Sequence, residues 1–135
     1  MNEGSAQLIS LEGIDVFYGD IQRLHQVSLK ILELEIVALV GANTAGKTTT
    51  LNTISGLVKP KSGQIKFLDQ RIDILPPYKI VELGIIQIPE NRRLFPYMTV
   101  MENLLLGCYN HRARTKYSEY LEEVFHILPV LTERE

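Results

Sequence analysis

The 135-residue chain is predicted to fold as a mixed α/β protein whose chemistry lies at a turn from a strand to a helix. Three observations predict this class. Strand-like segments come first, a continuous apolar run then leads through a glycine-rich loop into a helical pattern, and amphipathic helical patterns follow. A hydrophobic share of 45% supplies the material for a core, so we expect one domain over residues 1–135.

Three segments with strand character precede or enter the glycine-rich loop. Residues 7–18 combine β-branched and aromatic residues, and residues 26–31 alternate, which places their apolar side chains on one face. The third segment, EIVALVG at residues 35–41, is continuously apolar. Such a run predicts a strand that is buried on both faces.

Helical patterns dominate after the loop. Residues 46–56 predict a helix in which Leu51, Ile54 and Ser55 share a face. Thr99 and Glu102 have the spacing of a capping box at the start of a later helix. The further predicted elements are a turn and strand over 59–68, a helix over 76–84, a strand over 85–89, and helices over 99–107 and 118–128.

Charge and composition exclude several classes of protein. The net charge of −2 gives no basic face for a nucleic-acid partner, and the basic run at residues 110–116 is expected to be a solvated connection between helices. The single cysteine, Cys108, excludes an internal disulfide. Neither a signal peptide nor an apolar stretch of membrane-spanning length is recognisable, so a role at a membrane would require another chain as the anchor.

The loop GANTAGKTT at residues 41–49 satisfies the phosphate-binding pattern G-x-x-x-x-G-K-[ST]. Glycines let backbone N–H groups approach a phosphate, the start of the following helix adds unpaired N–H groups, and the lysine adds a positive charge. The alternative is a glycine-rich turn with an exposed lysine. We predict that nucleotide phosphates bind Gly41, Asn43, Ala45, Gly46, Lys47, Thr48 and Thr49, with the Thr48 hydroxyl also suited to Mg²⁺.

Longer matches surround this loop. EIVALVGANTAGKTTTLNTISGL, SGQIKFLDQRIDILPP and LGIIQIPENRRLFPYMTVMENLLLG occur in the order and spacing of one family. Over nearly its whole length the chain resembles the ATP-binding subunits of ABC transporters, and among them the LivF-type ATPases of branched-chain amino-acid importers. The resemblance implies a P-loop NTPase fold with an antiparallel β subdomain and an incomplete parallel core sheet with helices. It also implies ATP and Mg²⁺ as cofactors and a peripheral position on the cytoplasmic face of the cell membrane.

The resemblance assigns roles to residues outside the loop. Tyr18 matches the aromatic residue that stacks on adenine; the alternative is a core or strand-end aromatic with a structural role. Glu90 falls where many members have the glutamine of the Q-loop, which implies contact with Mg²⁺. A second ATPase subunit and transmembrane permease subunits are the implied partners. The segment that would contact the permease includes Arg92, Arg93, Phe95 and Tyr97.

The sequence also departs from the family. Residues 90–135 contain no Ser-Gly-Gly and no apolar strand that ends in Asp-Glu, so the signature motif, the Walker B aspartate, the catalytic glutamate and the switch histidine are not recognisable. We therefore expect a partial nucleotide-binding domain that binds Mg-ATP but does not hydrolyse it alone. Two other interpretations stay open: a non-catalytic interaction fragment or degraded gene product, and a different P-loop NTPase that lacks an antiparallel subdomain beside the loop.

Four turn positions carry larger residues where the family usually has glycine. They are Leu34, Thr44, Asp69 and Asn91. Asn and Asp tolerate left-handed backbone angles, whereas Leu and Thr do not. If Thr44 requires a positive φ, we expect weakened rather than abolished nucleotide binding.

Overall fold

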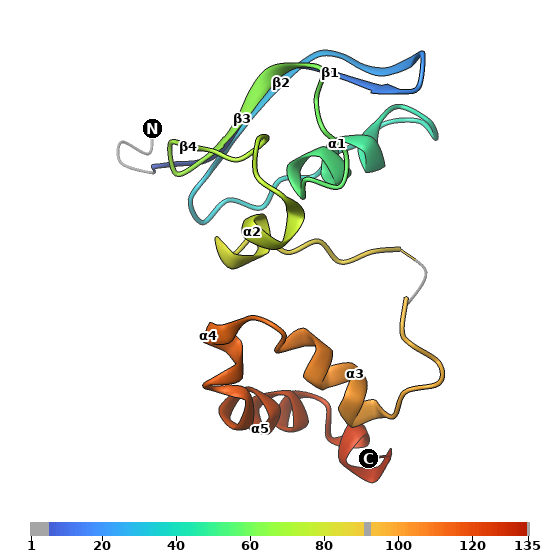
Figure 1. The fold of residues 1–135 in the computed structure, drawn as a ribbon, viewed down its shortest axis with the longest axis vertical. Helices are drawn as coiled ribbons and strands as arrows, with labels where there is room; N and C mark the ends of the chain where they lie inside the picture. The colour runs from blue at the N-terminus through green and yellow to red at the C-terminus, as the bar shows by residue number, and fades with distance from the viewer. Residues whose placement is uncertain (1–5, 91–92, 135) are drawn as a thin grey trace. The chain divides into compact units, whose positions relative to one another are not determined.

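The computed structural model describes residues 6–90 and 93–134, which lie in two compact units, residues 1–87 and residues 88–135 (Figure 1). Each unit is described by itself below. The prediction of one domain over the whole chain stays a prediction.

A four-stranded antiparallel sheet in the order β2–β1–β3–β4 is the framework of the first unit (Figure 1). Its strands are β1 (Gln7–Tyr18), β2 (Ile21–Leu32), β3 (Ser62–Phe67) and β4 (Gln70–Arg71). The two long strands form a hairpin in which Tyr18 lies opposite Ile21 across a two-residue turn. The strand predicted over 7–18 is confirmed, and the strand predicted over 26–31 is the second half of the longer β2. An antiparallel sheet beside the loop counts against the interpretation as a different P-loop NTPase.

The carboxylate of Asp15 ties three strands of this sheet together. It accepts hydrogen bonds from the Gln26 N–H at 2.9 Å, the Gln22 side-chain amide at 2.8 Å and the Ser62 hydroxyl at 2.5 Å. Gln26 interrupts the regular geometry of β2 with a positive φ of 48°. The hydrogen bonds from Ser62 and Gln26 favour the charged carboxylate, so they hold the pKa of Asp15 below its usual value. This polar contact stabilises the irregular register of β1 against β2.

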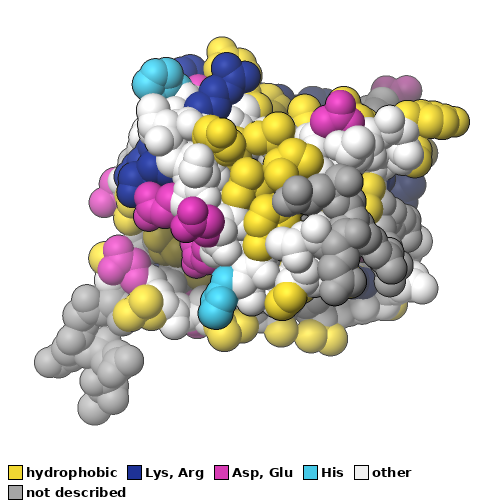
Figure 2. Space-filling model, turned by 90° about the horizontal axis from the view of Figure 1, so that it is seen from below, with side chains coloured by type: hydrophobic (Ala, Val, Ile, Leu, Met, Phe, Trp, Pro, Cys, Tyr) yellow, Lys and Arg dark blue, Asp and Glu magenta, His cyan; other side chains and the backbone are white. Residues whose placement is uncertain are grey.

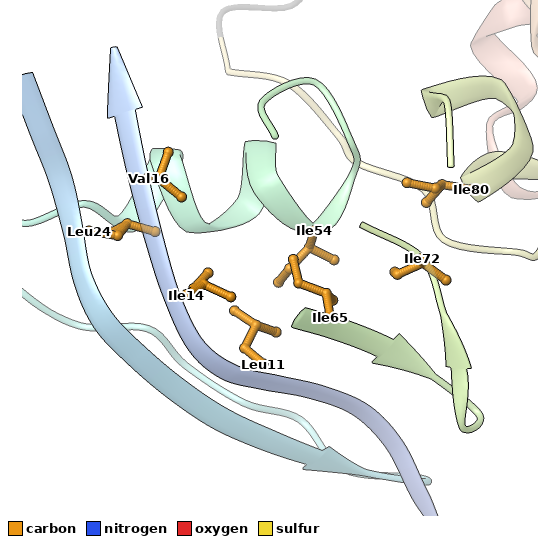
Figure 3. Packing of buried hydrophobic residues seen from close by; sticks show 8 residues of the cluster. All are labelled: Leu11, Ile14, Val16, Leu24, Ile54, Ile65, Ile72 and Ile80. Atoms are coloured by element: carbon orange, nitrogen blue, oxygen red, sulfur yellow. The ribbon is translucent and has the colours of Figure 1, made fainter. Parts of the chain in front are cut away.

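The core of the first unit lies between this sheet and two short helices, α1 (Lys47–Ile54) and α2 (Pro77–Glu82) (Figure 3). Its members are Leu11, Ile14, Val16, Leu24, Ile54, Ile65, Ile72 and Ile80. Burying a side chain of this size stabilises the folded state by about 1.5–3 kcal/mol. The helices predicted over 46–56 and 76–84 are confirmed, although each is slightly shorter than predicted.

The buried face of α1 carries Ile54, whereas Leu51, which was predicted to share a face with it, is 50% exposed. Thr50 and Thr53 are buried instead, and their hydroxyls donate to the C=O groups four residues earlier, at 3.0 and 2.7 Å. A threonine whose hydroxyl is satisfied in this way can lie in a core at little cost.

Asp73 is a buried carboxylate at the edge of the same core. It is 7% exposed and accepts hydrogen bonds from the Ile65 N–H at 2.9 Å and from Arg71 Nη2 at 3.0 Å. Burial alone would raise its pKa, but the Arg71 guanidinium and the Ile65 N–H outweigh burial and hold the pKa of Asp73 below its usual value. Lys59 donates to the Asp73 C=O at 2.7 Å, which adds a second tie between these segments.

The prediction of a strand is wrong for two segments. Residues 35–41 and 85–89 pair with no strand in the part of the chain that the structure describes. Ile36, Val40 and Ile88 are 99%, 89% and 90% exposed rather than buried. A strand is stable only when neighbouring strands satisfy its backbone groups and cover its side chains. The described strand pairs are all antiparallel, so the parallel part of the predicted fold is not formed within them.

Helices make up the second unit. They are α3 (Val100–Gly107), α4 (His111–Arg114), α5 (Tyr117–Ile127) and the short 3₁₀ helix η1 (Pro129–Arg134). The predicted capping box is confirmed: the Glu102 N–H donates to Thr99 Oγ1 at 3.2 Å, and the Thr99 N–H donates to the Glu102 carboxylate at 2.7 Å. The basic run at 110–116 contains α4 and is more ordered than the predicted connection, because Asn110 Oδ1 accepts from the Ala113 N–H at 2.8 Å and caps the helix.

Apolar surface is exposed in both units. Among the described residues, no helix has the length and hydropathy needed to cross a membrane. Large hydrophobic side chains nevertheless lie at the surface, from Ile36 in the first unit to Tyr97 in the second. Figure 2 shows hydrophobic side chains side by side on the face seen there, with charged side chains near them. Contiguous apolar surface marks contact sites more often than single exposed residues do.

Candidate phosphate-binding site

The glycine-rich loop ends at the start of α1, where Gly46 is the N-cap residue and Lys47 the first helical residue. Gly46 has a left-handed backbone with φ of 91°. A Cβ atom at this position would lie 2.6 Å from Cδ2 of Leu24, which is 3% exposed in the core. Position 46 therefore favours glycine for two reasons, the backbone angle and the close contact with β2.

The ammonium group of Lys47 folds back over the loop. Its Nζ donates to the C=O groups of Gly41 at 2.8 Å and Ala42 at 2.7 Å. The Ala45 N–H donates to the Ala42 C=O at 3.1 Å and closes a turn within the loop. Both partners of the ammonium group are uncharged carbonyls, so its positive charge remains available for an anion at this place.

The first turn of α1 provides further groups that favour an anion. It contains no acidic residue, and Gly46 offers no capping side chain. The N–H groups at the start of a helix lack intrahelical acceptors, and the helix dipole is positive there. Thr48 is exposed and Thr49 is half-buried in this turn. The Thr48 hydroxyl is a neutral oxygen ligand of the kind that Mg²⁺ prefers. The groups at the start of α1 therefore fit an anion with a divalent cation beside it.

The backbone at Thr44 has the positive φ on which the expectation of weakened binding depended. Thr44 has a φ of 73°, Leu34 has 61° and Asp69 has 63°. Left-handed angles disfavour a β-branched residue most strongly. Three of the four positions predicted to need glycine-like geometry therefore have it, and Asn91 lies outside the described residues.

The other residues predicted for the nucleotide lie in the same unit as the loop. Asn43 and Ala45 are exposed within the loop. Tyr18 ends β1 at the tip of the hairpin and is 45% exposed. Its stacking on a base stays a prediction.

Glu90 and the residues predicted to contact a permease lie beyond the first unit. Glu90 is exposed, and in the described part of the chain no group of three or more His, Cys, Asp or Glu side chains is placed to hold a metal ion. The role of Glu90 in binding Mg²⁺ therefore stays a prediction. Phe95 and Tyr97 are 57% and 102% exposed and Arg93 is exposed, whereas Arg92 lies outside the described residues.

Two residues that support these sites were not predicted from the sequence. Leu24 lies against the start of α1 at Gly46, but it is out of phase with the alternating Val27, Leu29 and Ile31, so the alternation of β2 did not identify it. Asn103 holds the loop before α3 through four hydrogen bonds. No sequence signal distinguishes this asparagine from an exposed helical one.

Comparisons with known proteins agree with the geometry. The pattern of the ABC transporter family matches residues 24–132. The chain is 37% identical over 127 residues to the high-affinity branched-chain amino acid transport ATP-binding protein BraG of Pseudomonas aeruginosa, covering 94% of this chain and 54% of BraG.

Two solved structures of an ATP-binding cassette of an ABC transporter, MJ1267, are also similar. One aligns with a TM-score of 0.78 at 26% identity, covering 96% of this chain and 56% of that one. The other, the ADP conformation of the same cassette, aligns with a TM-score of 0.65 at 30% identity, covering 76% and 41%. The chain thus spans about half the length of the curated relative it matches.

Proposed function

Because the chain belongs to the ABC transporter family, we propose that it binds Mg-ATP through the loop at residues 41–49 as the ATP-binding part of an importer. The observation that carries this proposal is the position of the Lys47 ammonium group. It lies on the carbonyls of Gly41 and Ala42, beside the open N-terminus of α1 and without a carboxylate partner among the described residues. A triphosphate is the ligand whose charge matches this arrangement.

Each residue of the site has a separate task in the proposal. The ammonium group of Lys47 and the N–H groups at the start of α1 bind phosphate oxygens. The Thr48 hydroxyl supplies an oxygen ligand for the Mg²⁺ ion, which when bound would offset phosphate charge. Tyr18, which is 45% exposed, stacks on the adenine ring.

The similarity to BraG supports branched-chain amino-acid import as the process in which the chain acts. Its partners in that process would be transmembrane permease subunits and a second ATPase subunit, at the cytoplasmic face of the membrane. The surface offered to the permease is the segment of Arg92, Arg93, Phe95 and Tyr97. The exposed aromatic side chains of Phe95 and Tyr97 favour this role, since aromatic residues are enriched in protein interfaces.

Calorimetric titration of Mg-ATP into the purified chain tests nucleotide binding. The substitution Lys47→Met is expected to weaken binding by roughly 10- to 150-fold, because it removes a charge-assisted hydrogen bond worth about 1.5–3 kcal/mol. Lys59→Met is the matched control: the Lys59 ammonium group also donates to two backbone carbonyls, those of Asp73 and Leu75, but lies outside the loop. Equal loss in both variants, or none in Lys47→Met, would refute the assignment.

A further inference from the structure

The side chain of Asn103 makes four hydrogen bonds to the loop that precedes α3. Its Oδ1 accepts from the Phe95 N–H at 3.0 Å. Its Nδ2 donates to the C=O groups of Phe95 at 3.1 Å, Met98 at 3.2 Å and Thr99 at 2.9 Å. One side chain therefore contacts both ends of the segment 95–99, which we call the clamped loop.

The orientation of the Asn103 amide is unambiguous, since three of its four partners are acceptors. A flipped amide would direct Oδ1 at three carbonyl oxygens and the NH₂ group at an N–H donor. The two hydrogens of the NH₂ group serve three carbonyls, so at least one is shared. A side-chain amide provides both kinds of group, because its NH₂ group has two hydrogens to donate and its C=O oxygen accepts.

The clamped loop directs its polar backbone groups inward and its side chains outward. The Met98 N–H donates to the Phe95 C=O at 3.1 Å, and the capping box of Thr99 and Glu102 fixes the C-terminal end. Phe95, Tyr97 and Met98 are 57%, 102% and 41% exposed. The aromatic side chains are exposed, while the Phe95 N–H and the C=O groups of Phe95, Met98 and Thr99 are already hydrogen-bonded.

We propose that Asn103 is a positioning residue that keeps the clamped loop in one conformation, with Phe95 and Tyr97 displayed for docking. A loop that is already ordered loses less conformational entropy when a partner binds. The identity of that partner, a membrane subunit, rests on the proposed function, whereas the clamp rests on the contacts of Asn103. The effect of Asn103 on docking is indirect and acts through the backbone of residues 95–99.

The substitution Asn103→Asp tests the clamp with the smallest change in shape. An aspartate keeps one acceptor for the Phe95 N–H but directs an oxygen at three carbonyls, so three hydrogen bonds are lost. Asn110→Asp is the matched control, because Asn110 uses only its Oδ1 to cap α4 and an aspartate retains that acceptor. Both variants change the net charge equally. Asn103→Leu, which removes all four hydrogen bonds without adding charge, separates the loss of the clamp from the effect of charge.

Two readouts report on the loop alone. Hydrogen exchange of the Phe95 and Met98 amides is expected to be about tenfold or more faster in Asn103→Asp and Asn103→Leu, with α5 amides unchanged. Because the chain contains no tryptophan, Tyr97→Trp supplies a single fluorescent reporter, whose anisotropy is expected to fall in both Asn103 backgrounds and not in Asn110→Asp.

Unchanged exchange and anisotropy in the Asn103 variants would overturn the proposal. So would an equal change in Asn110→Asp, or a loss of protection that extends through α5, since each would show that Asn103 does not act on the loop specifically. Neither readout involves nucleotide or a membrane subunit. A failure of Mg-ATP binding would therefore count against the proposed function and leave the clamp standing.

Discussion

The substitution Thr44→Gly is expected to stabilise the protein, although it removes a side chain. Thr44 has a φ of 73°, a left-handed angle that costs an L-residue about 1–2 kcal/mol. Glycine removes this strain but increases the freedom of the unfolded chain, which costs about 0.4–1 kcal/mol. The Thr44 side chain is exposed and makes no hydrogen bond within the described residues, so little contact energy is lost. The net expectation is a gain of up to about 1.5 kcal/mol.

Urea denaturation followed by far-UV circular dichroism measures this difference, since the chain has no tryptophan for fluorescence. Ala42→Gly is the control in the same loop. The backbone of Ala42 does not have a positive φ, so glycine there relieves no strain and is expected to cost about 0.4–1 kcal/mol. The two glycine substitutions should therefore move the free energy of unfolding in opposite directions.

The strain at position 44 also bears on nucleotide binding. If the loop is more strained at this position when it surrounds a phosphate than when it is free, Thr44→Gly should tighten Mg-ATP binding by at most about fivefold, the equivalent of about 1 kcal/mol. A Thr44→Gly variant that is destabilised as much as Ala42→Gly would refute the inference that position 44 is strained. Weaker Mg-ATP binding in a stabilised variant would refute its extension to the bound loop.

Three further outcomes are expected. Gly46→Ala should lower the free energy of unfolding by about 1–3 kcal/mol, because its methyl group would meet Leu24 2.6 Å away at a φ of 91°; thermal melting that matches the parent protein would contradict this. The pKa of Asp73 is lowered in the folded state, so its contribution to stability is present above about pH 4 and is lost as the pH falls below it. Asp73→Asn should accordingly lower the free energy of unfolding by about 1–3 kcal/mol at pH 7, because it weakens the contact with Arg71. The urea midpoints measured at pH 7 and at pH 3 should differ less in this variant than in the parent protein. Steady-state ATP turnover by this chain alone should not depend on Lys47, and turnover that Lys47→Met abolishes would show that the chain completes a hydrolytic site.

Local patterns in the sequence were sufficient for the elements that depend on neighbouring residues. The strand over 7–18, the glycine at the start of α1 and the capping box of Thr99 and Glu102 were all predicted correctly. Each is decided by the backbone preferences of a few adjacent residues, so the sequence carries the whole signal. The left-handed angles at Leu34 and Thr44 belong to the same class, since turn geometry is local too.

Apolar runs were the main source of error, because burial depends on what else is present. EIVALV has every local property of a buried strand, yet its side chains are exposed and its backbone is unpaired among the described residues. In α1 the reverse occurred, since Thr50 and Thr53 are buried while Leu51 is not. Periodicity identifies the residues that can be buried, and only the neighbouring elements determine which of them are.

The sequence by itself determined that a phosphate-binding loop precedes a helix, that its lysine follows its last glycine, and that the surrounding chain is of one family. The tertiary structure alone decided which groups support that loop and which support the clamped loop at residues 95–99. Leu24 and Gly46 are 22 residues apart in the sequence but lie in contact. The Lys47 ammonium group donates hydrogen bonds to the C=O groups of Gly41 and Ala42. Such contacts depend on distances between segments that the folded backbone sets, and no spacing along the chain encodes those distances directly.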